Sequence, residues 1–241
     1  EAYNINAYGR WEEGSYVLIR KETDEELAGR LGMDVAEVRN QLAKSRSVLL
    51  QERSRRERPR LDDKIICSWN ALLLSGLSDA ARYCGIDEAQ KAATRLGEYL
   101  FSKFLDTEGH LLHSIAKGKA GPRGYLEDYA TLIEGCIRLY SCCGDLVWMR
   151  RASDLTEFAM EHFAAGDQPF FYFTSDQDAD LIRKTVEVAD NVIPASNSTM
   201  AKDLFLLGLF FGKPDWIQRS EAMLERMKPS MDSYSGQYAN W

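Results

Sequence analysis

Residues 69–80 read WNALLLSGLSDA, and this stretch decides the fold. Its apolar and small side chains fall on one helical face, at Trp69, Leu72, Leu73, Gly76, Leu77 and Ala80. Because these positions keep the spacing of an amphipathic helix, the stretch predicts a helix with one buried side. The same spacing recurs in later segments, which we expect to be helices too: 88–104, 126–142, 146–163, 197–211 and 214–228.

Three glycines reveal an internal repeat. Gly85, Gly144 and Gly212 lie 59 and 68 residues apart, and each follows an apolar helical pattern, as a glycine that ends a helix does. When the chain is aligned on these glycines, equivalent offsets carry apolar side chains: Leu77, Cys136 and Leu204 eight residues before, and Leu96, Leu155 and Met223 eleven residues after. The sequence therefore predicts three copies of a helical hairpin.

The connections between the predicted helices alternate in length. Turns within a hairpin take a few residues, whereas the connections between hairpins, near 105–125 and 164–195, are long. The long connections contain short strand-like pieces at 111–113 and 170–174. Tight turns at one end and long loops at the other are typical of an α/α solenoid or toroid, and such loops often carry function. The fold class is therefore all-α, with helical hairpins that build part of an (α/α)6 toroid and short β pieces in the long loops.

A separate leading segment precedes the hairpins. We expect residues 1–64 to contain helices at 24–31 and 35–52 and a charged linker, and residues 65–241 to hold the three hairpins. The pattern at 27–42 also resembles a helix-turn-helix, so a DNA-binding role through Arg39 and Lys44 is a rival interpretation.

Composition excludes several classes of protein. With 241 residues, 45% of them hydrophobic, the chain suits one large or two small globular domains. Its net charge of −7 is unfavourable for nucleic acid, and no apolar run approaches the ~20 residues of a membrane span, so we expect neither partner. No signal peptide opens the chain and its five cysteines form no C-x-x-C pair, which favours a cytoplasmic protein with no metal and no cofactor. The missing initiator Met suggests a fragment.

Candidate site residues gather where the first helix of each hairpin begins. These three starts, near Trp69, Asp128 and Ser196, should lie at one end of three parallel helices. A pair of carboxylates about 5–10 Å apart is what glycoside hydrolysis requires. We expect catalytic carboxylates among Asp62, Asp63, Glu127, Asp128 and Asp190. Side chains expected to bind the substrate are Trp69, Asn70, His113, Tyr129, Asn191 and Asn197.

A structural interpretation of the same residues stays open. Ser68 and Ser196 are suitable N-cap residues, and Glu127 and Asp128 suit the positive end of a helix dipole. If these side chains only stabilise helix ends, the carbohydrate hypothesis fails.

Four motifs resemble one family. They cover residues 11–14 (WEEG), 58–70 (RPRLDDKIICSWN), 126–130 (LEDYA) and 190–198 (DNVIPASNS). In this order they resemble the spermatogenesis-associated protein 20 family, and the resemblance runs over essentially the whole chain. The resemblance implies a longer protein, in which a thioredoxin-like domain precedes an (α/α)6 toroid similar to six-hairpin glycosidases and sugar 2-epimerases. This chain would be the later half of that toroid.

Two main hypotheses for function follow. In the first, the chain is a glycosidase-like or epimerase-like domain that binds a carbohydrate-like small molecule through carboxylates at the mouth of the toroid. In the second, it is a non-catalytic helical scaffold that binds a partner or serves an attached thioredoxin-like domain. Because half a toroid exposes apolar helix surface, we also expect either a homo-oligomer or further sequence that closes the ring.

Overall fold

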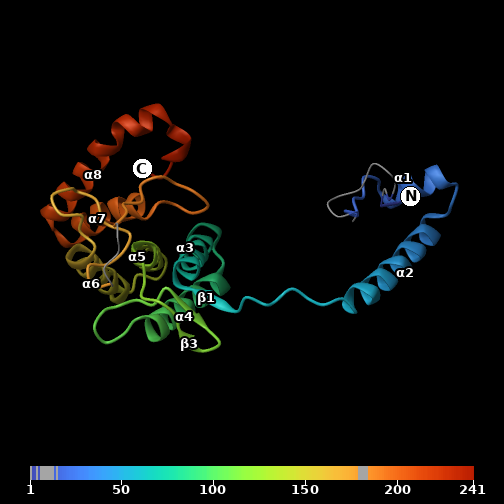
Figure 1. Ribbon diagram of the computed structural model, residues 1–241, viewed down its shortest axis with the longest axis horizontal. Helices are drawn as coiled ribbons and strands as arrows, with labels where there is room; N and C mark the ends of the chain where they lie inside the picture. The colour runs from blue at the N-terminus through green and yellow to red at the C-terminus, as the bar shows by residue number, and fades with distance from the viewer. Residues whose placement is uncertain (1, 4, 6–13, 15, 179–183) are drawn as a thin grey trace. The chain divides into compact units, whose positions relative to one another are not determined.

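The computed structural model divides into two compact units, residues 1–62 (unit 1) and 63–241 (unit 2). It describes residues 2–3, 5, 14, 16–178 and 184–241 (Figure 1). The motif at 11–14 lies outside the described residues, apart from Gly14.

Three helical hairpins make up unit 2, as the repeat predicts (Figure 1). The helices pair as α3 (Cys67–Cys84) with α4 (Asp87–Phe104), α5 (Leu126–Cys143) with α6 (Leu146–His162), and α7 (Ser196–Phe211) with α8 (Pro214–Ser233). The three aligned glycines end α3, α5 and α7 in the left-handed region, with φ of 67°, 73° and 65°. A side chain is strained in that conformation, which explains glycine at each turn.

Helix α5 is the centre of the core. It packs against α3 on one side and α7 on the other, and its buried side chains include Leu132, Ile133 and Leu139. The outer helices α4 and α6 meet through Gly97, where a Cβ atom would lie 2.7 Å from the Trp148 ring. The first helices of the hairpins thus form a parallel row, with their N-terminal ends at the long-loop side.

A small antiparallel sheet ties the start of α3 to the first long loop. Its strands are β1 (Lys64–Ile66), β2 (Ser114–Ala116) and β3 (Lys119–Ala120), in the order β1-β2-β3. Ile66 pairs with Ser114, and the Cys67 N–H donates to the His113 carbonyl. The strand expected at 111–113 is not formed: Leu111 makes an isolated bridge with Leu105, and Leu112 makes one with Arg123.

Unit 1 contains helices α1 (Asp24–Leu31) and α2 (Val35–Ser54) around a small core of Leu27, Ala28, Val38 and Leu42. The Thr23–Glu26 capping box opens α1, as its sequence predicts. On α2, the Arg39 guanidinium pairs with Asp24 at 2.9 Å and with Glu25 at 2.7 Å. These ion pairs occupy a side chain that the DNA-binding interpretation requires for phosphates or bases.

Several apolar side chains are exposed on helices α3 and α7 of unit 2. On α7 they are Phe205, Leu206, Leu209, Phe210 and Phe211, and on α3 they include Trp69 and Leu73. Among the described residues, no helix is both long and apolar enough to cross a bilayer.

Candidate functional site

The N-terminal ends of α3 and α5 meet at Asp128. This side chain is wholly buried, and its Oδ1 accepts the Ser68 N–H at 2.9 Å. Its Oδ2 accepts the Tyr125 N–H at 2.9 Å, so one carboxylate satisfies backbone donors of both helices. The expectation that Ser68 caps α3 is wrong: Ile66 holds the N-cap position, and the capping oxygen comes from a residue 60 positions away.

His113 completes this cluster from the first long loop. Its Nδ1 lies 2.9 Å from Asp128 Oδ2 and 3.8 Å from Glu127 Oε1. The hydrogen bond to Asp128 raises the pKa of His113, against the effect of burial. Because Asp128 accepts at Nδ1, that nitrogen carries the proton in the neutral ring and Nε2 keeps a lone pair. The structure gives Nε2 no hydrogen-bond partner among the residues it describes.

Glu127 is the accessible acid of the cluster. Its side chain is 17% exposed, whereas that of Asp128 is fully buried. Burial raises the pKa of Glu127, and the charges of Asp128 and Glu187 raise it further. Burial also raises the pKa of Asp128, but the hydrogen bonds from His113, Tyr125 and Ser68 oppose that rise. The pKa of Glu127 therefore lies above the ordinary value of a glutamate, although the charge of His113 opposes that rise.

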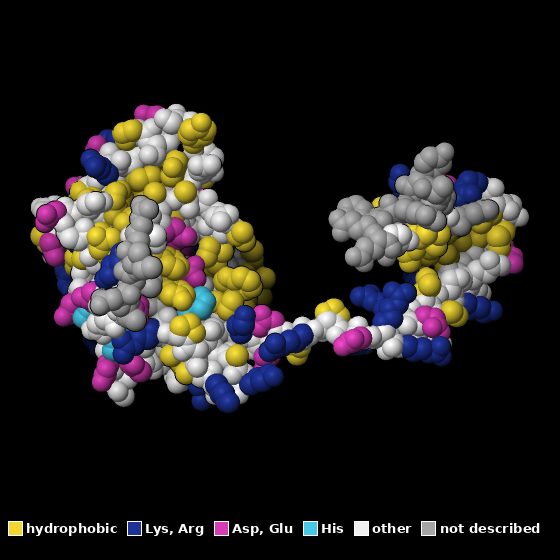
Figure 2. Space-filling model, viewed as in Figure 1, with side chains coloured by type: hydrophobic (Ala, Val, Ile, Leu, Met, Phe, Trp, Pro, Cys, Tyr) yellow, Lys and Arg dark blue, Asp and Glu magenta, His cyan; other side chains and the backbone are white. Residues whose placement is uncertain are grey.

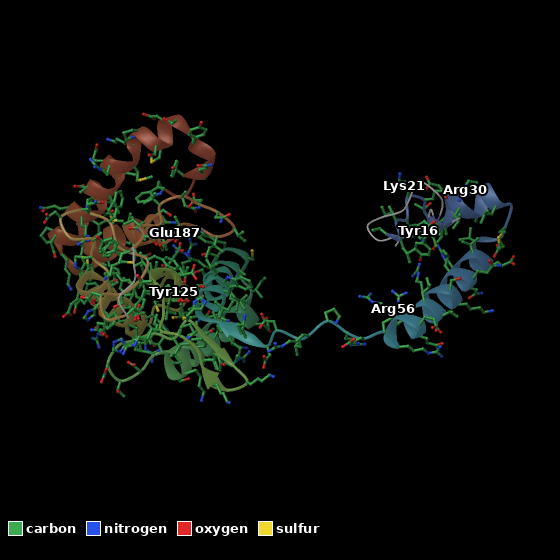
Figure 3. All side chains as sticks on the ribbon, in the orientation of Figure 1. Tyr16, Lys21, Arg30, Arg56, Tyr125 and Glu187 are labelled. Atoms are coloured by element: carbon green, nitrogen blue, oxygen red, sulfur yellow. The ribbon has the colours of Figure 1, made fainter. Side chains whose placement is uncertain are left out.

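Aromatic side chains form one wall beside the cluster. The Tyr125 ring lies 4.9 Å from His113 and stacks on Phe173 at 5.0 Å between centroids. Phe173 also accepts the Leu126 N–H through its carbonyl, which fixes the second long loop to the start of α5. Figure 3 labels two residues of unit 2: Tyr125, at the end of the first long loop, and Glu187, in the second. Figure 2 shows histidine and acidic side chains together near the middle of this face of unit 2.

Other predicted residues support the loops instead of facing a ligand. Asp190 accepts the N–H groups of Ala195 and Asn240. Asn197 is fully buried, and its amide bonds to the Phe171 backbone and the Glu187 carbonyl. The structure therefore corrects the expectation that Asn197 contacts a substrate, because both polar atoms of its amide already make hydrogen bonds within the protein.

The structure also corrects the expectation that Tyr129 binds the substrate. Its side chain is 1% exposed, and its hydroxyl accepts the Leu111 N–H and donates to the Gly109 carbonyl. It is a core residue that holds the first long loop. Likewise Ser196 is not the N-cap of α7: Ala195 holds that position, and the Ser196 N–H donates to Glu187 at 3.1 Å.

The remaining predicted residues lie at the edge of the cluster or away from it. Trp69 is 62% exposed on the first turn of α3, and the Asn70 amide donates to the Ile66 carbonyl. Asn191 is exposed. Asp62 ends unit 1 and Asp63 begins unit 2, and no contact described here joins Asp63 to His113. Of the five predicted carboxylates, the described contacts bring only Glu127 and Asp128 to His113.

Sequence reasoning missed Phe173 and Glu187. Neither residue belongs to a recognisable motif, and each reaches the cluster only because the second long loop returns to the start of α5. His113, Glu127 and Asp128 could also hold a metal ion, since their ligand atoms lie within 4.8 Å of one another. Asp128 already accepts three hydrogen bonds there, so an ion would have to displace one of them.

Unit 2 has the fold of part of a six-hairpin, glycosidase-like α/α toroid, of which it holds three hairpins. Unit 2 is similar to a GH76 α-mannanase of Bacteroides thetaiotaomicron, with a TM-score of 0.59 and 12% identity over 71% of this chain and 46% of that one. It is also similar to a cellobiose 2-epimerase of Bacillus thermoamylovorans (TM-score 0.55, 12% identity, 70% and 46% covered). A D-mannose isomerase gives a TM-score of 0.56 at 15% identity, with 69% and 43% covered. At these identities the likeness shows the fold alone.

The sequence relatives confirm the family resemblance. The chain is 29% identical over 231 residues to spermatogenesis-associated protein 20 of Homo sapiens, covering 90% of this chain and 29% of that protein. It is 28% identical over 218 residues to an uncharacterised protein of Caenorhabditis elegans, covering 85% and 29%. The chain thus spans 29% of the length of the curated relatives it matches. No family model matches.

Proposed function

We propose that unit 2 binds a carbohydrate and transfers protons on it, as a sugar isomerase or epimerase does, with His113 as the base and Glu127 as the acid. The observation that carries this proposal is the bond between His113 Nδ1 and Asp128 Oδ2 at 2.9 Å. It fixes the tautomer of the imidazole and leaves Nε2 as a positioned base.

The hydrogen bonds of Asp128 argue against glycoside hydrolysis. Hydrolysis through two carboxylates needs one of them as a nucleophile or as the base for water. Asp128 is fully buried and already accepts three hydrogen bonds, so its oxygens cannot reach a sugar carbon. The cluster then offers the His113 imidazole and the Glu127 carboxyl group, a pair that suits proton transfer next to a carbonyl group, while Glu187 accepts the Ser196 N–H.

The proposed step is balanced within the cluster. His113 Nε2 takes the proton from the carbon next to the carbonyl of an open-chain sugar, and that C–H bond breaks. The C–H electron pair forms the C=C bond of an enediol, while the carbonyl π pair moves to the carbonyl oxygen, which Glu127 protonates. Delivery of the proton from His113 to C1, with the O2 proton passing to Glu127, gives the ketose. Delivery of a proton to C2 from the opposite face, with the O1 proton returning to Glu127, gives the epimer. Tyr125, stacked on Phe173, would support the sugar on its apolar side.

A deuterium exchange experiment tests this function. D-mannose, D-glucose and cellobiose are incubated with the protein in D2O, and NMR follows deuterium at C2 and the new sugar signals. Parallel assays with nitrophenyl glycosides report hydrolysis. His113→Gln and Glu127→Gln should each lower exchange by about 10²–10⁴-fold. The control Glu221→Gln, exposed on α8, should leave it unchanged. Hydrolysis without exchange, or full exchange in His113→Gln, would contradict the proposal.

The exposed apolar faces of α3 and α7 support a second proposal, about partners. We propose that further helical hairpins of the toroid cover them, since the chain covers 46% of the similar mannanase chain. Side chains such as Leu209, 59% exposed, and Phe210, 43% exposed, are costly to leave in water. In this chain alone, the same faces should drive self-association.

A further inference from the structure

Unit 1 contains a pocket that plays no part in the proposed function. The pocket has a volume of about 710 Å³ and lies between the C-terminal half of α2 and the segment that precedes α1. All the described residues that line it belong to unit 1, so the pocket is independent of the cluster around His113.

One part of the pocket lining is apolar. Leu18 comes from the segment before α1, and Leu49 and Leu50 come from α2. These three leucines are 45%, 45% and 63% exposed, so the fold of unit 1 buries only part of their surface. Tyr3 and Tyr16 add two aromatic rings to the same lining. A ligand with an apolar body would gain free energy by covering these side chains.

The other part of the lining is basic. It consists of the guanidinium groups of Arg46, Arg53 and Arg56. Arg46 Nε donates to the Tyr3 hydroxyl at 2.9 Å, which joins α2 to the segment before α1. Among the residues that the structure describes, no carboxylate pairs with these three side chains, and none lines the pocket. Figure 2 shows Lys and Arg side chains next to hydrophobic ones on unit 1.

Other arginines of unit 1 do have acidic partners. Arg30, Arg39 and Arg55 pair with carboxylates at 2.7, 2.9 and 2.7 Å. The helix dipole favours cations only in the last turn of a helix, so it does not account for Arg46, which lies eight residues before the end of α2. Because like charges repel, three guanidiniums around a pocket without an acid favour an anionic ligand.

A second pocket of about 500 Å³ adjoins the first and shares Leu50, Arg53 and Arg56 with it. Its lining adds a further cation, Arg58, and one acid, Glu57. Positive charge therefore also predominates on this side of Arg53 and Arg56.

We propose that the pocket of unit 1 binds an amphipathic anion, a carboxylate or phosphate on an apolar chain. The acid group binds the three guanidiniums, and the chain covers the leucines and tyrosines. A guanidinium suits this acid group because it donates two parallel hydrogen bonds to a carboxylate or a phosphate. An inorganic anion would leave the apolar lining in water, and a neutral chain would leave the three charges unpaired, so the ligand needs both parts.

Titration of the full chain with decanoate, below its micelle concentration, tests this proposal. In NMR spectra of leucine methyl groups, Leu18, Leu49 and Leu50 should shift, whereas the core residue Leu132 of unit 2 should not. The affinity for decanoate should exceed that for 1-decanol and that for inorganic phosphate by about tenfold or more, because each of these lacks one part of the ligand. Added salt should weaken the binding of decanoate.

A variant that carries both Arg53→Gln and Arg56→Gln should lose about tenfold or more in affinity for decanoate, since charge-assisted hydrogen bonds are lost. The matched control is Arg55→Gln on the same turn, because Arg55 pairs with Glu52 and lines neither pocket. Its affinity should change by less than about twofold. Circular dichroism of each variant checks that the helices are intact.

Three outcomes would overturn the proposal. The first is the absence of decanoate binding in the wild-type chain. The second is equal binding of decanoate and 1-decanol with methyl shifts at Leu206 and Leu209, which would assign the binding to the exposed apolar face of α7. The third is binding to phosphatidylglycerol vesicles without binding of free decanoate, which would assign the basic residues to a membrane surface.

Discussion

His113 and Asp128 join the first long loop to the row of first helices, with His113 Nδ1 2.9 Å from Asp128 Oδ2. The same carboxylate receives N–H groups from the start of α3 and the start of α5. One buried acid thus orients the proposed base and joins two helix ends, so the stability of the fold and the geometry of the site depend on the same side chain.

Replacing Asp128 should therefore destabilise the protein. Asp128→Ala removes the acceptor of three hydrogen bonds and leaves buried N–H groups unpaired, which should cost about 2–5 kcal/mol in the free energy of unfolding. Urea denaturation followed by circular dichroism measures this loss. Asp154→Ala, an exposed carboxylate on α6, is the matched control and should change stability by less than about 0.5 kcal/mol. A loss of the same size in both variants would refute the structural role.

The pair also predicts how stability depends on pH. Asp128 raises the pKa of His113 above its ordinary 6.5 in the folded protein. A raised pKa means that the folded state holds the proton more tightly, so this contribution is complete below pH 6.5 and disappears as pH rises through the folded value. Melting temperatures between pH 6 and 9 should fall less steeply in His113→Gln than in the wild type. If the melting temperatures of the wild type and His113→Gln fell equally with pH, the prediction would be wrong.

Asp203 on α7 predicts a second loss of stability with rising pH, one that begins at lower pH. Its carboxylate is buried, and neither oxygen has a hydrogen-bond partner among the described residues. Burial raises the pKa of Asp203 well above its usual value, and the nearby charge of Glu134 adds to the effect. Since the unfolded chain loses this proton more readily, stability should decline as pH rises above about 4.

Asp203→Asn removes that ionisation. We expect the variant to be more stable than the wild type at pH 7, by about 1 kcal/mol or more, with a difference that shrinks towards pH 4. Thermal unfolding at several pH values is the measurement, and Asp232→Asn, exposed on α8, serves as the control. A destabilised Asp203→Asn protein at pH 7 would show that the carboxylate is ionised and paired.

Two glycines within helices should respond differently to the same substitution. In Gly97→Ala the new methyl group would lie 2.7 Å from the Trp148 ring, and relieving that clash should cost about 1–3 kcal/mol. In Gly76→Ala the methyl group meets open space on α3. The higher helix propensity of alanine should therefore raise the free energy of unfolding by about 0.5–1 kcal/mol. Chemical denaturation of the pair separates the packing effect from the propensity effect.

The exposed face of α7 should control association. Leu209→Lys and Phe210→Lys place charges on this face and should shift the protein towards the monomer in light scattering at several concentrations. Leu146→Lys, on an exposed leucine at the start of α6, should leave the molar mass unchanged. A wild-type chain that is monomeric at every concentration would contradict the expected self-association.

The sequence determined the helices and their hairpin pairing. Apolar spacing depends only on neighbours along the chain, and three glycines at equivalent turns supply the left-handed residue that each helix end requires. The helix limits expected from this spacing agree with the observed ones to within two residues, except at the ends of α3 and α8. The motif at 126–130 contains Glu127 and Asp128, the two predicted carboxylates that lie beside His113.

Only the tertiary structure decided which side chains meet. The oxygen that caps α3 comes from Asp128, 60 residues further along the chain, although Ser68 looks like a cap in the sequence. Phe173 and Glu187 reach the cluster through a long loop whose path depends on contacts with α5 and α7. Local patterns fix helices because helical hydrogen bonds are local, whereas a site assembled from two loops depends on distances that no spacing along the chain encodes.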